Sequence, residues 1–184
     1  MTRKTISELI AQATADFPDN AAGLITPAKL RNWAIDFLNA ISPAYSVLSA
    51  VGPLNQTFGP VPVLVAFNAV TNSLPSEMVA AVPASTITRT DRGTVQFDLS
   101  IDFECQTNRF VTFIVYKNGV ATTWRQTGNG AGAGNPVSVS LAGIDYADPA
   151  AVYSVQAICE TAGTVVTMTN MAFVVSIVPV RAYT

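Results

Sequence analysis

The chain has 184 residues, enough for one medium domain or for a small domain with a short appendage. Only 12% of the residues are charged, against roughly 25% in an average soluble domain, while 49% are hydrophobic. This composition excludes intrinsic disorder, which needs low hydropathy and high charge. Because so few charges would leave a folded surface poorly solvated, we expect copies of the chain or partner proteins to cover part of it.

Membrane and nucleic-acid partners are also disfavoured. The longest uncharged stretch, between Asp36 and Glu77, is interrupted by prolines and glycines and contains no apolar run of about 18 residues. A net charge of -2 gives no basic footprint for nucleic acid. The basic start at Arg3 and Lys4 is followed by polar residues instead of an apolar signal core, so we expect synthesis in the cytoplasm.

The residues that most enzyme chemistry requires are missing. The chain has no histidine, which is the commonest general base and the commonest metal ligand. Cys105 and Cys159 each end an alternating strand pattern, so we expect two free buried thiols rather than a disulfide or a zinc site. The glycine-rich stretch 128–135 lacks the spacing of a dinucleotide fingerprint or a P-loop. We therefore expect no cofactor and no enzymatic activity.

Two groups of carboxylates leave alternatives open. Asp98, Asp102 and Glu104 share one face of a strand and could form a glycosidase pair, although solvation of that face is the simpler role. Asp145 and Asp148 could bind calcium, although the surrounding ligand density is low.

Residues 1–42 are predicted to form a helical N-terminal segment. Thr5 and Glu8 have the spacing of a capping box, and the helical pattern that follows reaches Pro18. A second helix is predicted to start at Thr26-Pro27 and to end before Pro43.

The apolar stripe of these helices needs a partner, because about 25 helical residues bury too little surface to fold alone. The stripe either docks on the rest of its own chain or anchors the protein to sister copies or to a larger assembly. Aromatic anchors carry much of the energy of an interface. The candidate anchor residues are Leu30, Arg31, Trp33 and Phe37.

Residues 43–61 are predicted to be an extended linker, and residues 62–184 an antiparallel β-sandwich of about eight or nine strands. From Val61 onward the apolar pattern has period two, and it is longest in Val95–Cys105. Asn118-Gly119 is a strong hairpin signal between two further strands. The fold class is thus mainly β with a short α-helical start.

Two strands are apolar on both faces, namely Phe110–Tyr116 and Met171–Val180. The outer face of a two-layer sandwich is normally wet, so such strands suggest a sheet that packs against another subunit. Trp124, next to the glycine-rich stretch, is the candidate for a ligand-facing loop. The candidate subunit-interface residues are Phe110, Phe113, Tyr116 and Phe173.

Two resemblances cover most of the chain. The residues Thr5-Ile6-Ser7-Glu8-Leu9, Pro18-Asp19-Asn20, Gly23 to Pro27 and Arg31 resemble the N-terminal segment of many tailed-bacteriophage virion proteins. The hairpin Tyr116-Lys117-Asn118-Gly119, the strand Pro136 to Leu141 and the end Val178-Pro179-Val180-Arg181 resemble the trimeric tumour-necrosis-factor-like jelly roll that such proteins often carry.

These resemblances imply a non-enzymatic structural protein of the virion, assembled in the host cytoplasm as a homotrimer. It would be a capsid decoration or head-fibre protein, attached through its N-terminal helices to the major capsid protein or to another virion protein. The alternative is a tail-fibre or receptor-binding module that recognises a host surface glycan. Neither alternative involves a nucleic-acid or membrane partner.

Overall fold

A computed structural model describes residues 8, 11–13, 15, 29–34, 37, 44–73, 78–82 and 84–178. The chain divides into two compact units, Met1–Pro43 with Pro179–Thr184, and Ala44–Val178. In the first unit, residues 8, 11–13 and 15 and residues 29–34 and 37 are helical, at the two places where helices were predicted. No helix among the described residues is long and apolar enough to cross a membrane.

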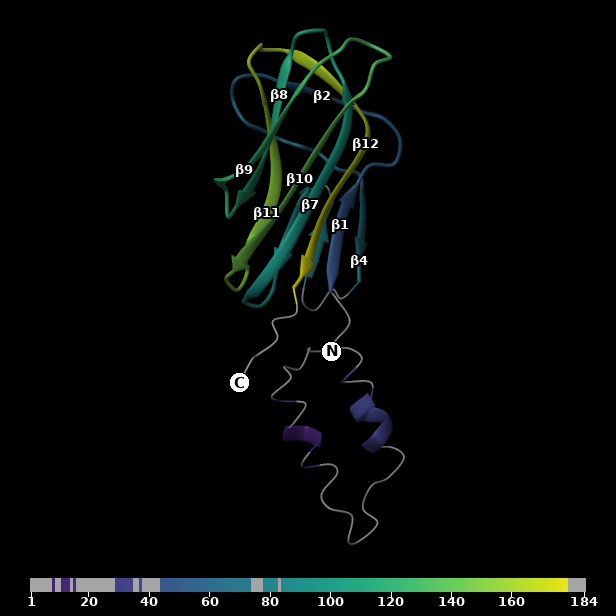
Figure 1. Cartoon of the computed structure of the whole chain (residues 1–184), viewed down its shortest axis with the longest axis vertical. Coiled ribbons are helices and arrows are strands. Elements are labelled where there is room, and N and C mark those ends of the chain that lie inside the picture. The colour runs from purple at the N-terminus through teal and green to yellow at the C-terminus, as the bar shows by residue number, and fades with distance from the viewer. Residues whose placement is uncertain are drawn as a thin grey trace. The chain divides into compact units, whose positions relative to one another are not determined.

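The second unit is a sandwich of two antiparallel sheets, which confirms the predicted fold class (Figure 1). Sheet A has the strand order β10-β7-β12-β1-β4, with β2 also paired to β12. The bounds of its strands are β1 Tyr45–Ser49, β2 Leu54–Phe58, β4 Ala69–Asn72, β7 Gly93–Glu104, β10 Val137–Ala147 and β12 Thr164–Ile177.

Sheet B has the strand order β5-β6-β11-β8-β9, with β3 also paired to β11. Asn118 and Gly119, both with positive φ, form the turn between β8 and β9, where the hairpin was predicted. The bounds of its strands are β3 Val63–Leu64, β5 Met78–Ala81, β6 Thr86–Arg89, β8 Phe110–Lys117, β9 Val120–Asn129 and β11 Val152–Cys159.

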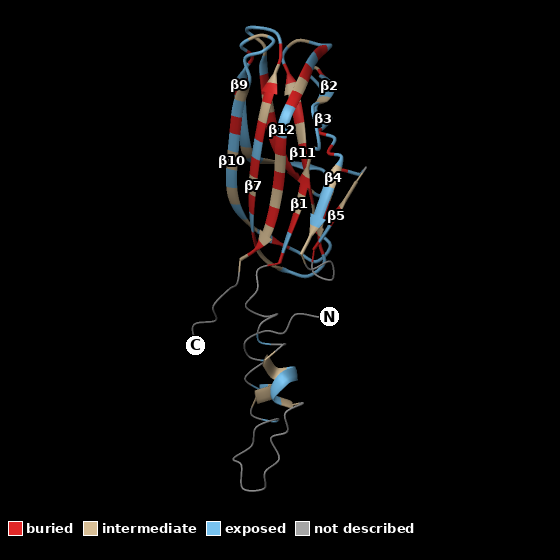
Figure 2. Ribbon diagram, turned by 90° about the vertical axis from the view of Figure 1, so that its right-hand side faces the viewer, coloured by how far each residue is buried: buried red, intermediate tan, exposed pale blue. Residues whose placement is uncertain are grey.

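The core lies between the two sheets and follows the alternation read from the sequence. Along β7, buried residues alternate with exposed or half-buried ones, and Figure 2 shows the same banding along β12. Facing side chains of sheet B complete the core. Its largest fully buried members include Phe58, Phe97, Phe103, Phe113, Tyr153 and Phe173.

The prediction of a linker at residues 43–61 is wrong. This stretch contains β1 and β2, and both pair with the last strand, β12. Leu48 and Phe58 from the same stretch are fully buried in the core. The prolines and glycines that suggested a linker end these short strands and turn the chain between them.

Candidate functional site

The candidate anchor residues lie in the first unit. The rings of Trp33 and Phe37 stack with centroids 5.4 Å apart, so the structure brings these two residues together. Leu30 is 53% exposed and Phe37 is 41% exposed, and Arg31 is exposed as well. The segment therefore presents an apolar surface, and its role as an anchor stays a prediction.

Two of the four candidate interface residues are placed differently from the prediction. Phe113 and Phe173 are fully buried in the core of their own chain, and Phe113 packs edge-on against Phe103 at 5.5 Å between centroids. They cannot contact another subunit in this fold. Both strands carry apolar residues on both faces, so the sequence could not show which residues face inward.

Phe110 and Tyr116 lie on the outer face of sheet B, opposite in direction to the core residues of β8. Tyr116 pairs with Ser154, which is also outside the core, while its neighbour Val115 is in the core. Phe110 is 43% exposed, but Tyr116 is already buried within its own chain. Of the four candidates, only Phe110 keeps a large surface for a partner.

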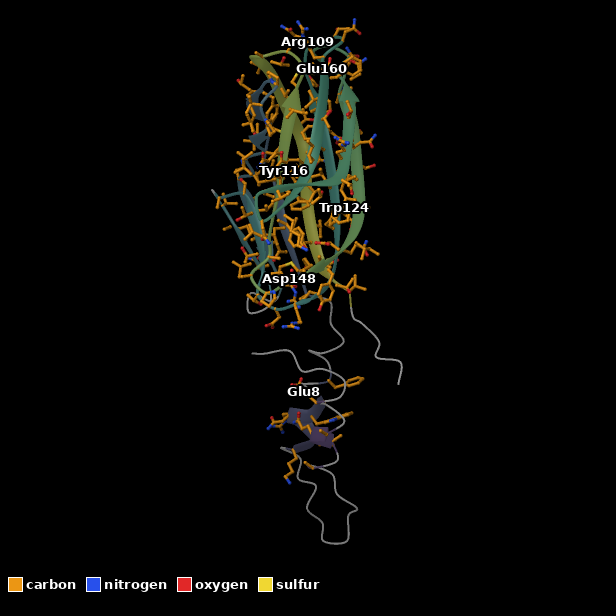
Figure 3. The ribbon with its side chains drawn as sticks, turned by 90° about the vertical axis from the view of Figure 1, so that its left-hand side faces the viewer. Glu8, Arg109, Tyr116, Trp124, Asp148 and Glu160 are labelled. Carbon is orange, nitrogen blue, oxygen red and sulfur yellow. The ribbon has the colours of Figure 1, made fainter. Side chains whose placement is uncertain are left out.

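Trp124 lies in the middle of β9, so its prediction as a ligand-facing loop residue is wrong. Its ring packs edge-on against Phe97 with centroids 4.7 Å apart. Gly143 on β10 leaves the room for this contact, because a Cβ there would lie 2.8 Å from the indole nitrogen. Figure 3 shows Trp124 far from the end of the sandwich that carries Arg109, whose carbonyl accepts a hydrogen bond from Gly130 of the glycine-rich loop.

The surface with the clearest functional character is the outer face of sheet A, which sequence reasoning did not single out. Strand pairing aligns its side chains in rows that run across β10, β7, β12 and β1. The first row is Ile144, Gln96, Ser176 and Tyr45, the second is Ala142, Asp98, Val174 and Val47, and the third is Ser140, Ser100, Ala172 and Ser49.

This face combines bulky apolar side chains at one end with a hollow of small residues beside them. Ile144 is 62% exposed and Tyr146, on the same strand face, is 56% exposed. The shallow hollow has a volume of about 290 Å³. Its lining residues are Asp98, Leu99, Ser100, Ser140, Leu141, Ala142, Ala172 and Val174.

The other end of the face carries hydrogen-bonded carboxylates. Asp102 accepts hydrogen bonds from Ser138 Oγ at 2.6 Å and from Asn170 Nδ2 at 3.2 Å. Glu104 accepts one from the backbone N–H of Gly134 at 2.8 Å. These partners fit the solvating role expected for the carboxylates, and nothing in the arrangement singles out a glycosidase pair.

Asp145 points to the inside of the sandwich, where it joins the two sheets. Its carboxylate forms an ion pair with Lys117 Nζ at 2.8 Å and accepts a hydrogen bond from the buried Tyr153 hydroxyl at 2.6 Å. Burial would raise the pKa of Asp145, but the bonds from Lys117 and Tyr153 outweigh it and hold this pKa below its usual range. Burial and the bond to Asp145 raise the pKa of Tyr153.

These contacts disfavour the calcium site considered for Asp145 and Asp148, because a cation and a hydroxyl of the same chain already bind the Asp145 carboxylate. Within the described residues, no three His, Cys, Asp or Glu side chains form a group that could hold a metal ion. Cys105 and Cys159 are free and buried, and burial raises the pKa of the Cys105 thiol.

Comparisons with known proteins give the fold and no closer relationship. No protein-family model matches the chain, and no curated protein matches its sequence. The structure of murine APRIL matches with a TM-score of 0.50 at 13% identity, over 73% of this chain and 99% of that one. The structure of Eiger TNF from S. frugiperda gives a TM-score of 0.48 at 11% identity, over 77% of this chain and 96% of that one. The sandwich of this chain thus has the jelly-roll architecture of the tumour-necrosis-factor fold.

Proposed function

We propose that the chain is a non-enzymatic structural protein that assembles as a homotrimer through the outer face of sheet A. The observation that carries this proposal is the pair Ile144 and Tyr146, two large apolar side chains that are mostly exposed beside a hollow of small residues. Ile144 and Tyr146 are neighbours on one strand face, and adjacent exposed apolar side chains of this size are typical of a protein–protein contact.

Self-association suits this face better than a small ligand. The hollow is shallow and, apart from Asp98, is lined by hydroxyl-bearing and aliphatic side chains that offer no ionic recognition of a ligand. Covering the neighbouring apolar side chains would contribute roughly 25 cal/mol for each Å² removed from water. Most soluble homo-oligomers have closed symmetry, and the jelly-roll resemblance implies three copies.

A charge in the apolar part of this face tests the proposed interface. We expect Ile144→Asp to convert the oligomer into a folded monomer, because a carboxylate would be desolvated in the contact. The matched control is Val51→Asp, which changes an aliphatic residue that is even more exposed and lies between β1 and β2, outside the rows of this face. Light scattering would measure the mass of each variant, and an unchanged oligomer for Ile144→Asp would contradict the interface.

We further propose that the protein belongs to a tailed-phage particle, as a capsid decoration or head-fibre protein held by its N-terminal segment. The supports are the resemblance of residues 5–31 to virion proteins and the exposed Leu30 and Phe37. Deletion of residues 1–42 should abolish binding to purified particles and leave the sandwich folded. A truncated chain that still binds would remove the anchor role.

The alternative of a glycan-binding tip has lost the residue on which it rested, since Trp124 packs against Phe97. Host-cell binding by the isolated protein, with no retention on DNA-filled heads, would favour that alternative over the decoration role.

A further inference from the structure

The two sheets carry charges of opposite sign. Every charged residue within the strands of sheet A is acidic, and every charged residue within the strands of sheet B is basic. The acidic residues are Asp98, Asp102, Glu104 and Asp145, and the basic residues are Arg89, Lys117 and Arg125. With 12% charged residues in the whole chain, such a separation places the few charges of opposite sign on different sheets of one molecule.

Arg125 is the strand cation that remains available to a partner. Arg89 is buried, and Lys117 pairs with Asp145. Arg125 is exposed on β9, an edge strand, and makes no side-chain hydrogen bond or ion pair with any residue that the structure describes.

Asp98 is the carboxylate best placed to receive it. Asp102 and Glu104 accept short hydrogen bonds from Ser138 and Gly134, whereas Asp98 accepts a single longer one, at 3.2 Å, from the flexible side chain of Gln96. Asp98 also lines the hollow on the outer face of sheet A. An arginine side chain that entered this hollow would meet one carboxylate among small residues.

The two residues lie at the same level along the sandwich. Trp124 packs on Phe97 and approaches Gly143, and Gly143 pairs with Phe97 across β10 and β7. Arg125 follows Trp124 and Asp98 follows Phe97, so each residue is one position along its strand from a pair of rings in contact. In a ring of copies whose rotation axis runs parallel to the strands, the rotation moves no atom along the axis. Arg125 and Asp98 therefore keep their heights along the axis in every copy.

We propose that Arg125 at the β9 edge of one copy enters the sheet A hollow of the next copy and pairs with its Asp98. This inference rests on the proposed self-association and adds its ionic contact. Such a face-to-edge contact uses two different surfaces and therefore closes into a ring when the rotation closes. A face-to-face dimer would instead bring like-charged sheet A faces together.

A charge swap in the full-length protein tests the pairing. Arg125→Glu and Asp98→Lys should each weaken self-association at least about tenfold, because each places like charges in contact. The double variant Arg125→Glu with Asp98→Lys restores opposite charges in every contact of the ring, and should recover the association to within about threefold. The matched control is Arg92→Glu, which reverses an exposed cation in the loop between β6 and β7 and should change nothing.

Light scattering over a range of concentrations gives the dissociation constants, and circular dichroism shows that each variant is folded. Asp98→Asn is the milder substitute if Asp98→Lys does not fold. It should weaken association less than the reversal does, and an Asp98→Asn variant that associates like wild type would count against the pair. An intact oligomer in Arg125→Glu, or a double variant that is no better than its parents, would overturn the pairing and leave the homotrimer standing. A monomeric wild-type protein would overturn the proposed function itself.

Discussion

Gly128 and Gly143 allow β9 of sheet B and β10 of sheet A to pack closely together where these strands meet at the open edge of the sandwich. A Cβ at Gly128 would lie 2.8 Å from the Phe103 ring and 2.9 Å from Val139. Such distances are below normal van der Waals contact, so neither position accepts a side chain without displacement of the core. The glycine-rich stretch thus begins as a packed part of β9 and not as an exposed loop.

Gly143→Ala should destabilise the sandwich by roughly 1–3 kcal/mol, because the new methyl group would overlap with Phe97 and Trp124. Urea unfolding followed by Trp fluorescence would measure the change. Gly59→Ala is the control, since its methyl group would meet no atom closer than 3.4 Å. Equal stabilities of the two variants would contradict the packing described for the open edge.

The Asp145–Lys117 ion pair should make stability depend on pH in the acid range. The folded protein lowers the pKa of Asp145, so the stabilisation is complete above the unfolded pKa of about 3.9 and is lost as pH falls through the lower folded value. Lys117→Met should therefore cost on the order of 1 kcal/mol at neutral pH.

Urea unfolding at pH 7 and below pH 3 would measure the unfolding free energy of wild type and of Lys117→Met at each pH. The difference between wild type and Lys117→Met should shrink at the lower pH, as the carboxylate of Asp145 takes up its proton in the folded state as well. The same difference for Arg92→Met, an exposed cation in a loop, should not shrink in this way. A Lys117→Met effect that did not depend on pH would contradict the ion pair.

Among the elements, β7 is an inner strand of sheet A that pairs with both β10 and β12 along most of its length. Phe97 on this strand is fully buried and contacts Trp124 from the opposite sheet. Phe97→Ala should cost roughly 3–5 kcal/mol of unfolding free energy, because it leaves a cavity between the sheets. Phe110→Ala, at a half-exposed position, should cost less than about 1 kcal/mol, and a chemical denaturation curve for each variant would check both values.

The strands that carry a local signal could be predicted from the sequence, and those stabilised by distant partners could not. β7 alternates without interruption, and Asn118-Gly119 by itself marks the hairpin between β8 and β9. β2 is short and lies between glycine and proline residues, and its partner β12 is more than a hundred residues away, as the hydrogen bond between Thr167 and Asn55 illustrates. Only the assembled sheet makes such a strand stable.

The sequence also could not show which face of the apolar strands lies toward the core. β8 carries apolar residues on both faces, and its register with β9 shifts between Ile114 and Tyr116. Val111, Phe113 and Val115 face the core in unbroken alternation, but Ile114 and Tyr116 on the opposite face are apolar too, so the pattern does not show which set faces inward. For this reason the interface residues read from the strand pattern included two core residues, and the outer face of sheet A was missed.

At the scale of the whole molecule, the low charge content has a structural explanation. The strands of sheet A contain no Lys or Arg, and the outer face of this sheet exposes Ile144 and Tyr146 without a partner in the chain. Buried apolar side chains fill the interior of the sandwich, but the outer face of sheet A also exposes apolar side chains to water. A partner that covers this face would resolve the mismatch, and the second and third copies of the proposed homotrimer would serve as that partner.

The mass of the purified full-length protein in solution tests this account most directly. Light scattering at micromolar concentration should give three times the 19.4 kDa mass of the chain. A mass of 19.4 kDa at the same concentration would contradict it.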